Sequence, residues 1–519
     1  MQELIGFLPI LLVTSAVVLL LCSLLPRGER YVNPIAVLSS ATAFAMSLAI
    51  LHHVVNNGVT TYFFGGFRPP LGISYTVDVL SALLGLLSMA MLLLTVLYST
   101  WFITSKWAYL YYSLLFLMAT GSVGCLYTGD IFNFFVSLEL LAIASYALTA
   151  FYRGNPRAVT AALRYAISGT IATSLYLFSV TLVYSAFGTL NIADIALKVR
   201  NPEAQVPFSQ GVAGDIVLTS KVAFSIMTWV FLFKTAILPL GFAWQPQAYA
   251  EAPVPIAAGF TAIADAVGLY WFLRFFNTVL GRDAIPALSS FREALLSFLQ
   301  VVAILSALVA ALLMSMQRDA KKFIAYSTIS QFSLALLGIS LDSSYGTASA
   351  LLHIVSNAIG DAILFYVTGI AVAGCGRSIK CLAVLKASRC ALASLFIAIL
   401  NLFGITPLLL GFWAKALLVL AGLGKSLALP VVTLVVSGIA AIGYFRLFYK
   451  AITSHTEVKS DPRLRSTATP TLLALALAAT AVALGLCFTL CTQFQNFILG
   501  IGDEIASNYG EYIVKTLWS

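Results

Sequence analysis

Residues 234–255 read KTAILPLGFAWQPQAYAEAPVP and follow a long apolar run. Lys234 begins this stretch, and Pro239 and Gly241 come shortly after it. Because proline removes a backbone donor and clashes with the preceding turn, we expect a helix to break or kink here. A lysine near the bilayer centre costs about 2.5–3.5 kcal/mol on insertion scales. A broken helix is tolerated in a membrane only where protein buries it or where it lines a wet cavity. We therefore expect the rest of the chain to place partners around this lysine.

The composition predicts an all-α polytopic membrane protein. Of the 519 residues, 60% are hydrophobic and only 9% are charged, and the mean hydropathy is +0.97. A soluble domain of this size carries far more charge. Because about 20 apolar residues cross the hydrocarbon, the apolar runs predict about fourteen transmembrane helices, near residues 4–25, 32–55, 77–98, 107–127, 130–152, 158–186, 216–241, 255–277, 295–316, 322–341, 347–373, 391–423, 427–450 and 469–500.

The basic residues fall unevenly on the two sides of these spans. The net charge of +9 sits in short loops and at span ends, so it does not indicate nucleic-acid binding. One side carries Arg27, Arg30, Lys106, Arg153, Arg157, Arg164, Arg318, Lys321, Lys322, Arg377, Lys380, Lys386, Arg389, Arg446, Lys450, Lys459, Arg463 and Arg465. The other carries only Arg68, Lys198, Arg200, Lys221, Arg274, Arg282, Arg292, Lys425 and Lys515. The positive-inside rule places the first set in the cytoplasm and both termini outside it, in a multi-pass protein of the cell membrane.

Motifs for metals and redox cofactors are missing from the sequence. The seven cysteines show no CxxC spacing, and we interpret them as small apolar filler. No GxGxxG phosphate loop and no haem motif occurs. We therefore expect no metal site and no cofactor in this chain, and no redox chemistry of its own.

A carboxylate interrupts the apolar run at 130–152. Asp130 stands at the start of this run and is most simply a helix N-cap. Glu139 lies in the middle, between FFVSL and LLAIA, with no basic residue near it in the sequence. A carboxylate at that depth needs a cation or must become neutral. We interpret Glu139 as a proton or ion site that pairs with a lysine on another helix; the alternative is a neutral, hydrogen-bonded structural glutamate.

Five sequence blocks resemble a known family. TGDIFNFFVSLELLAIASYAL (128–148) is similar to the D-type subunit of Mrp cation/proton antiporters and to the antiporter-like subunits of membrane-bound hydrogenases and respiratory complex I. The other blocks are FGTLNIADIA (187–196), KTAILPL with WQPQAYAEAPVPIAA (234–258), RDAKKFIAYSTISQ (318–331) and TPLLLGFWAK (406–415). Their order along the chain matches the order in the family.

The resemblance implies an architecture of fourteen helices with two inverted five-helix repeats, each containing a discontinuous helix. The sequence is compatible, because Pro407 and Gly411 precede Lys415 five spans after Lys234. An odd number of spans makes the second unit enter from the opposite side. We therefore divide the chain into N-terminal helices 1–3 (1–106), a first antiporter half (107–277), a second half (295–450) and a C-terminal helix (451–519).

The resemblance also implies roles for individual residues. The family glutamate of the fifth span pairs with the lysine of the seventh, and these positions are Glu139 and Lys234 here. Protons then pass along a row of buried charged groups to the lysine of the twelfth span, here Lys415. His353 matches the first family histidine of the eleventh span and titrates near neutral pH. A packing role is its alternative.

The middle of the row departs from the family pattern. The lysine of the eighth span is replaced by Ala266, with Asp265 beside it, and the eleventh span has Asn357 and Asp361 in place of a histidine and a lysine. Two buried carboxylates cannot both be ionised without partners. Three readings remain open: Asp265 and Asp361 pair with Lys234 and Lys415, they form a carboxylate cation site, or the row is degenerate.

These residues predict a proton- or cation-translocating subunit of a multi-subunit complex, either an Mrp-type Na⁺/H⁺ antiporter or the antiporter-like module of a redox-driven pump. The alternative is a non-conducting scaffold subunit. The expected partners are other membrane subunits and the lipid bilayer, and the candidate cargo is H⁺ or Na⁺.

Overall fold

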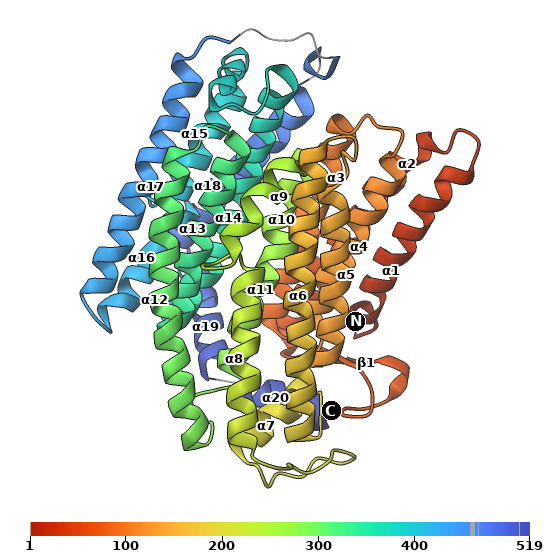
Figure 1. Ribbon diagram of the computed structural model, residues 1–519, viewed down its shortest axis with the longest axis vertical. Helices are drawn as coiled ribbons and strands as arrows, with labels where there is room; N and C mark the ends of the chain where they lie inside the picture. Colours follow the sequence, from red (N-terminus) through yellow and green to blue (C-terminus); the bar gives the residue numbers. More distant parts are fainter. Residues whose placement is uncertain (1, 457–461, 466, 508, 519) are drawn as a thin grey trace.

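The computed structural model of the chain describes residues 2–456, 462–465, 467–507 and 509–518. Over this part the chain forms a bundle of long helices with one two-stranded hairpin at its lower end (Figure 1). Within the described residues, 13 helices are long and apolar enough to cross a membrane. This confirms the predicted all-α polytopic class.

In the N-terminal part of the bundle, several helices begin at polar capping residues. Its elements are α1 (Gln2–Leu21), α2 (Glu29–Asn57), β1 (Thr60–Phe63), β2 (Ser74–Val77), α3 (Val79–Phe102), α4 (Ala108–Tyr127), α5 (Ile131–Thr149), α6 (Pro156–Phe187) and α7 (Ile192–Arg200). Asp130 Oδ1 accepts from the backbone N–H groups of Phe132 and Asn133, each at 2.8 Å. The predicted N-cap at Asp130 is therefore confirmed.

The first predicted helix break is present. α8 (Ile216–Lys234) ends at the lysine, and the chain then passes Pro239 and a short 3₁₀ turn at Gly241–Ala243 before α9 (Gln245–Glu251) begins. A long helix returns as α10 (Val254–Phe260) and α11 (Ala266–Arg274), with π-helical turns at Thr261–Asp265 and Phe275–Val279. Gly241 is required at the break, because a Cβ there would lie 1.9 Å from the carbonyl carbon of Ala236.

The second half contains the second predicted break. Its helices are α12 (Pro286–Met316), α13 (Ala320–Ser340), α14 (Ser344–Gly374), α15 (Arg389–Phe403), α16 (Leu410–Leu423) and α17 (Ala428–Thr453). Pro407 lies between α15 and α16, and Gly411 lies in the first turn of α16. α8 runs upward and α15 runs downward in Figure 1, so the two discontinuous helices enter from opposite ends.

The C-terminal region differs from the single helix that the sequence predicts. The apolar run near 469–500 forms two helices, α18 (Ala468–Leu490) and α19 (Thr492–Ser507), and α20 (Tyr509–Trp518) follows. The chain turns at Cys491, whose backbone is extended. α20 packs on α7 and on the β1–β2 hairpin, so it closes the lower end of the bundle (Figure 1).

One further prediction from the sequence was wrong. Cys375 and Cys381, taken as apolar filler, form a disulfide in the segment after α14. Lys321 lies at a span end as expected, and the structure adds that it is buried, with 3% of its surface exposed. Spacing alone did not show either feature, because both depend on segments that meet only in the folded chain.

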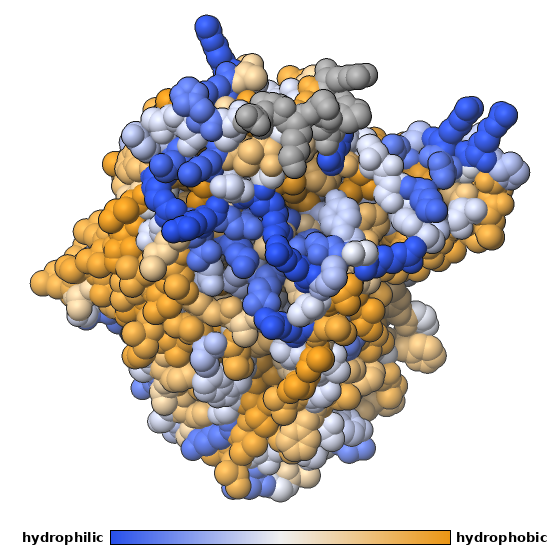
Figure 2. Space-filling model, turned by 45° about the horizontal axis from the view of Figure 1, so that its top comes forward, coloured by the Kyte–Doolittle hydropathy of each residue, from blue (hydrophilic) through white to orange (hydrophobic). Residues whose placement is uncertain are grey.

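The two ends of the bundle differ in polarity. Figure 2 shows hydrophilic side chains gathered at the upper end, while the flanks are largely hydrophobic. The connections between α1 and α2, α3 and α4, and α5 and α6 lie at that end (Figure 1), and these carry residues of the larger basic set. Both labelled termini lie in the lower half of the molecule.

A buried ion pair ties α3 to α11 near the lower end. Arg274 Nη2 donates a hydrogen bond of 2.8 Å to Asp78 Oδ1, and Arg274 Nη1 forms an ion pair with Asp78 Oδ2 at 2.8 Å. Asp78 also caps α3 by accepting from the N–H of Ser81. Burial acts to raise the pKa of Asp78, but Arg274 outweighs it and holds this pKa below its ordinary value. Asp78 is therefore a carboxylate at neutral pH, and the pair fixes the helix that carries the second π-turn.

We predict that Asp78→Ala destabilises the fold strongly, because it leaves the Arg274 guanidinium buried without a counter-charge. The expected loss in the free energy of unfolding is about 3–5 kcal/mol, measured by unfolding of the purified protein in detergent. Asp215→Ala is the matched control, since Asp215 also caps a helix, accepting from Val217 and Leu218, but is exposed and has no arginine partner. Its expected cost is about 1 kcal/mol. Equal losses in the two variants would contradict the prediction.

A second prediction concerns the first helix break. Gly241→Ala should lower the free energy of unfolding by about 1–3 kcal/mol, because its Cβ overlaps the backbone of Ala236 and the break must shift. Gly438→Ala on α17 is the control, since nothing lies within 4 Å of a Cβ built there. Thermal unfolding of the two variants in the same detergent compares them. An unchanged midpoint for Gly241→Ala would show that the backbone of Ala236 does not lie this close to residue 241.

Candidate functional site

Lys234 is the last residue of α8 and lies at the first break. Two backbone carbonyls of this helix end have partners: the N–H of Ile237 bonds to Leu232, and Trp244 Nε1 bonds to Phe233 at 3.1 Å. Only 9% of Lys234 is exposed. Within the described residues, its ammonium makes no direct hydrogen bond and no ion pair, so it stands at the carbonyl end of its own helix as a buried charge.

Glu139 lies in the middle of α5 and is half-buried. It interacts electrostatically with Lys234, which also interacts with Cys125 and Asp265. The structure thus brings Glu139 and Lys234 near each other, but in the described part of the chain no direct ion pair joins them. In a low dielectric, charges still interact strongly over such separations.

Lys415 on α16 satisfies the end of the other discontinuous helix. Its ammonium donates to the carbonyl oxygens of Leu402 at 3.1 Å and Phe403 at 2.7 Å, the last residues of α15. Unpaired carbonyls and the negative end of the helix dipole both favour a cation at this place. Asn401 completes the junction, because its side chain accepts from Gly411 N and donates to the carbonyl of Ser356 on α14.

His353 lies on α14 beside this second break. Its Nδ1 is 2.9 Å from the carbonyl oxygen of Ser349, so Nδ1 is the protonated nitrogen of that bond. Its Nε2 is buried with no hydrogen-bond partner within the described residues. His353 interacts electrostatically with Lys415, and Ser349 Oγ donates to Ala414, the residue before that lysine.

The two central carboxylates do not pair with lysines in the described structure. Asp265 Oδ2 accepts from Gln245 Nε2 and from the hydroxyl of Tyr249, both at 2.6 Å. Asp361 Oδ2 accepts from three side chains, Thr328 at 2.6 Å, Asn357 at 3.0 Å and Thr261 at 3.2 Å. Both carboxylates are almost completely buried. Neutral hydroxyl and amide donors take the place that lysines were expected to fill.

The described residues also offer no cluster of acidic ligands around these carboxylates. No group of three or more His, Cys, Asp or Glu side chains comes together there. A cation at this place would therefore rely on hydroxyl and amide oxygens beside one carboxylate.

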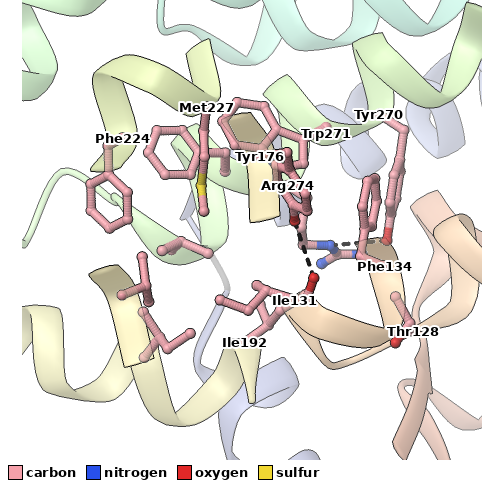
Figure 3. A pocket seen from close by; sticks show the side chains of 14 residues that line it. Thr128, Ile131, Phe134, Tyr176, Ile192, Phe224, Met227, Tyr270, Trp271 and Arg274 are labelled. Carbon is pink, nitrogen blue, oxygen red and sulfur yellow. Dashed lines mark hydrogen bonds between the residues drawn. The ribbon is translucent and has the colours of Figure 1, made fainter. Parts of the chain in front are cut away.

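A small separate cavity lies between α5, α6, α8 and α11 (Figure 3). Its lining includes Ile131, Phe134, Tyr176, Trp271 and Arg274, and its volume of about 30 Å³ suffices for about one water molecule. In Figure 3 the Tyr176 hydroxyl donates to the Ile131 carbonyl, and Arg274 Nε donates to Tyr270. None of the six predicted ion-translocation residues lines it, so it is not the candidate site.

Sequence reasoning missed several contributors to the site. Lys321 at the start of α13 donates to the carbonyl oxygens of Ala250 and Ala252, at the end of α9. Tyr249 on α9 and Thr261 in the π-turn after α10 bond to the central carboxylates. Hydroxyl side chains are ordinary in membrane helices and gave no signal, and the burial of Lys321 depends on carbonyls of a distant segment.

Comparison with known proteins gives the family. The model of the NADH:quinone oxidoreductase/Mrp antiporter transmembrane family matches residues 128–440. The chain is 30% identical to the N-type subunit of the NADH-quinone oxidoreductase of Desulforudis audaxviator, over 82% of this chain and 81% of that protein. It is 27% identical to the D-type subunit of the Na(+)/H(+) antiporter of Bacillus subtilis, over 98% and 96% of the two chains.

Solved structures agree in fold over the whole chain. A chain of the membrane-bound sulfane sulfur reductase, an archaeal respiratory membrane complex, superposes with a TM-score of 0.86 at 27% identity and covers 100% of both chains. A chain of the Mrp complex from Dietzia sp. gives 0.82 at 20% identity, covering 99% of each. The chain therefore belongs to the NADH:quinone oxidoreductase/Mrp antiporter transmembrane family, as a multi-pass, antiporter-like membrane subunit.

Proposed function

We propose that this chain translocates protons as one subunit of a multi-subunit complex in the cell membrane, with both termini outside the cytoplasm. The observation that carries the proposal is a row of buried titratable groups that crosses both halves of the bundle. Electrostatic interactions link Glu139 to Lys234, Lys234 to Asp265, and Asp265 to Asp361. His353 and Lys415 continue the row at the second break. Such groups are costly in a membrane and typically mark ion pathways.

Glu139 and Lys234 form the entry of the proposed row. Their titrations are coupled in a low dielectric, so the binding of one proton is a property of the pair and cannot be assigned to either residue alone. A charge that approaches from a neighbouring subunit would shift this balance. Release of the proton from Lys234 toward Asp265 would then start transfer along the row. The break at residues 235–244, where the α-helix is interrupted, supplies the place where the lysine can move.

Proton is the favoured cargo. The central groups within the described residues are single carboxylates surrounded by hydroxyl and amide groups, and no acidic cluster adjoins them. Hard cations take several oxygen ligands at once, and here a cation would have to displace the N–H and O–H donors that already bond to each carboxylate. Na⁺ remains the alternative cargo, because the related D-type proteins are named for Na(+)/H(+) antiport.

Transport by substituted complexes tests the proposal. Glu139→Gln and Lys234→Ala should each abolish coupled proton transport in vesicles, because each removes one partner of the coupled pair at the entry. Glu203→Gln and Lys425→Ala are matched controls, since both side chains are exposed in loops at the lower end. Transport that survives both site substitutions would favour the non-conducting scaffold role.

The partner subunits distinguish two settings for the same function. The likeness to the sulfane sulfur reductase over the whole chain favours a redox-driven complex, while the D-type relatives favour an antiporter. We expect the complex purified from native membranes in mild detergent to contain cluster-binding subunits, identified by mass spectrometry and iron content. Recovery with small membrane subunits alone, and no iron, would instead assign the chain to an antiporter.

A further inference from the structure

We infer that the hydroxyl groups of Tyr249 and Thr261 join Asp265 to Asp361 and carry protons between the two halves of the molecule. The inference rests on the proposed function, and it assigns the transfer step to two residues that carry no charge. The chain has Ala266 and Asp361 at the positions where the resembled family has lysines. Tyr249 and Thr261 bond to the carboxylates at and beside these positions.

The bridge is continuous in distance. The Tyr249 hydroxyl donates to Asp265 Oδ2 at 2.6 Å and lies 3.3 Å from Thr261 Oγ1. Thr261 Oγ1 in turn donates to Asp361 Oδ2 at 3.2 Å. The first step is a short hydrogen bond, and the other two, at 3.3 and 3.2 Å, are somewhat longer than the usual O–H···O distance, so each closes with a small movement of a hydroxyl. The four side chains are between 0 and 2% exposed, so bulk water does not offer a parallel route at this point.

The elements that meet here belong to different halves. Tyr249 lies on α9, the second part of the first discontinuous helix, while Thr261 and Asp265 are the two ends of a π-turn. Asp361 lies on α14 of the second half. π-turns inside α-helices are rare and occur frequently at functional sites. The bridge therefore crosses the boundary between the halves.

Thr261 behaves differently from an ordinary threonine in a helix. Threonine hydroxyls usually donate to a carbonyl in the preceding turn of their own helix. Thr328, for example, bonds to the carbonyl of Ile324 as well as to Asp361. The Thr261 hydroxyl donates to Asp361 and lies 3.3 Å from the Tyr249 hydroxyl, and within the described residues it makes no bond to its own helix. Its hydroxyl is thus held between the two carboxylates.

The step conserves atoms and charge. When Asp265 is protonated and Asp361 is ionised, the Asp265 O–H bond breaks and its proton passes to Tyr249 Oη. The Tyr249 proton passes to Thr261 Oγ1, and the Thr261 proton passes to Asp361. Three O–H bonds break and three form, and one proton has moved from Asp265 to Asp361. Both hydroxyls stay neutral and then rotate back, which hydroxyl groups can do because each is both donor and acceptor.

The bridge leads onward to the second break. Asp361, Asn357 and His353 follow one another at four-residue spacing along α14, and side chains at this spacing are neighbours on a helix. Each has a buried atom with no hydrogen-bond partner among the described residues: Asp361 Oδ1, Asn357 Oδ1 and His353 Nε2. These atoms mark the continuation of the path toward Lys415.

Removal of the hydroxyls tests the bridge. In the intact complex, Tyr249→Phe and Thr261→Val should each slow proton transport in vesicles roughly tenfold or more, while Thr261→Ser, which keeps a hydroxyl, should stay within about twofold of the unsubstituted protein. Since the two hydroxyls act in series, the double variant should be no slower than the slower single variant. Two independent structural defects would instead multiply.

The controls repeat the same chemical changes elsewhere. Tyr111→Phe removes a fully buried hydroxyl that bonds to Ser99, and Thr228→Val removes one that bonds to its own helix. Both should transport at the unsubstituted rate. If Thr261→Val fails to assemble, Thr261→Ala replaces it and is compared with Thr261→Ser. The bridge then requires the alanine variant to be slow and the serine variant to be fast.

The outcomes distinguish a failure of the bridge from a failure of the proposed function. Full transport in both Tyr249→Phe and Thr261→Val, together with loss in Glu139→Gln, overturns the bridge and leaves the proposed function standing. Full transport in Glu139→Gln overturns the proposed function itself. Equal slowing by Thr261→Ser and Thr261→Val also overturns the bridge, because it shows that packing rather than the hydroxyl matters.

Discussion

A lysine ammonium inside a bilayer requires negative partners, and in this molecule the ends of short helices supply them. Lys415 binds the last carbonyls of α15, and Lys321 binds those at the end of α9. Lys234 is itself the last residue of α8, and within the described residues its ammonium bonds to no carbonyl. The helix ends therefore provide carbonyls for Lys415 and Lys321 and a dipole end for Lys234, which make these buried charges tolerable. The long, unbroken helices around them hold the breaks in place.

The buried carboxylates at the centre of the molecule are stabilised in a different way from the lysines. Two carboxylates lie buried between the lysines, and neutral donors satisfy them instead of cations. This arrangement lets each carboxylate exist with or without its proton, because a hydroxyl can turn to donate or to accept. A fixed lysine–carboxylate pair would hold one charge state more firmly. The proposed row thus contains two kinds of buried site, lysines at helix ends and carboxylates held by hydroxyl and amide groups.

Much of the framework follows from the sequence, and the reasons are local. Pro239 with Gly241, and Pro407 with Gly411, marked both helix breaks, because these residues cannot continue a helix or are needed for close approach. Asp130 marked a helix start through its capping chemistry. The buried charges were visible as polar residues in apolar runs.

What the sequence could not supply depends on contacts between distant segments. The partners of Asp265 and Asp361 come from α9, α13, α14 and the π-turn after α10, and nothing in the spacing of threonines and tyrosines shows that they converge. The Cys375–Cys381 disulfide and the buried Lys321 were missed for the same reason. The last apolar run divides into two helices at Cys491, and no proline or glycine at this point indicates the break.

The π-turn at Thr261–Asp265 makes the length of this helix matter as well as its composition. A π-turn holds one residue more than an α-turn. Deletion of one residue here would let the helix rewind into regular α geometry, and Thr261 and Asp265 would then be three residues apart instead of four. Such a change would alter no hydroxyl or carboxylate, yet it would change the spacing at which Thr261 and Asp265 meet their common partner, Tyr249. Among related chains, a one-residue gap at this turn would therefore separate those that can form the bridge from those that cannot.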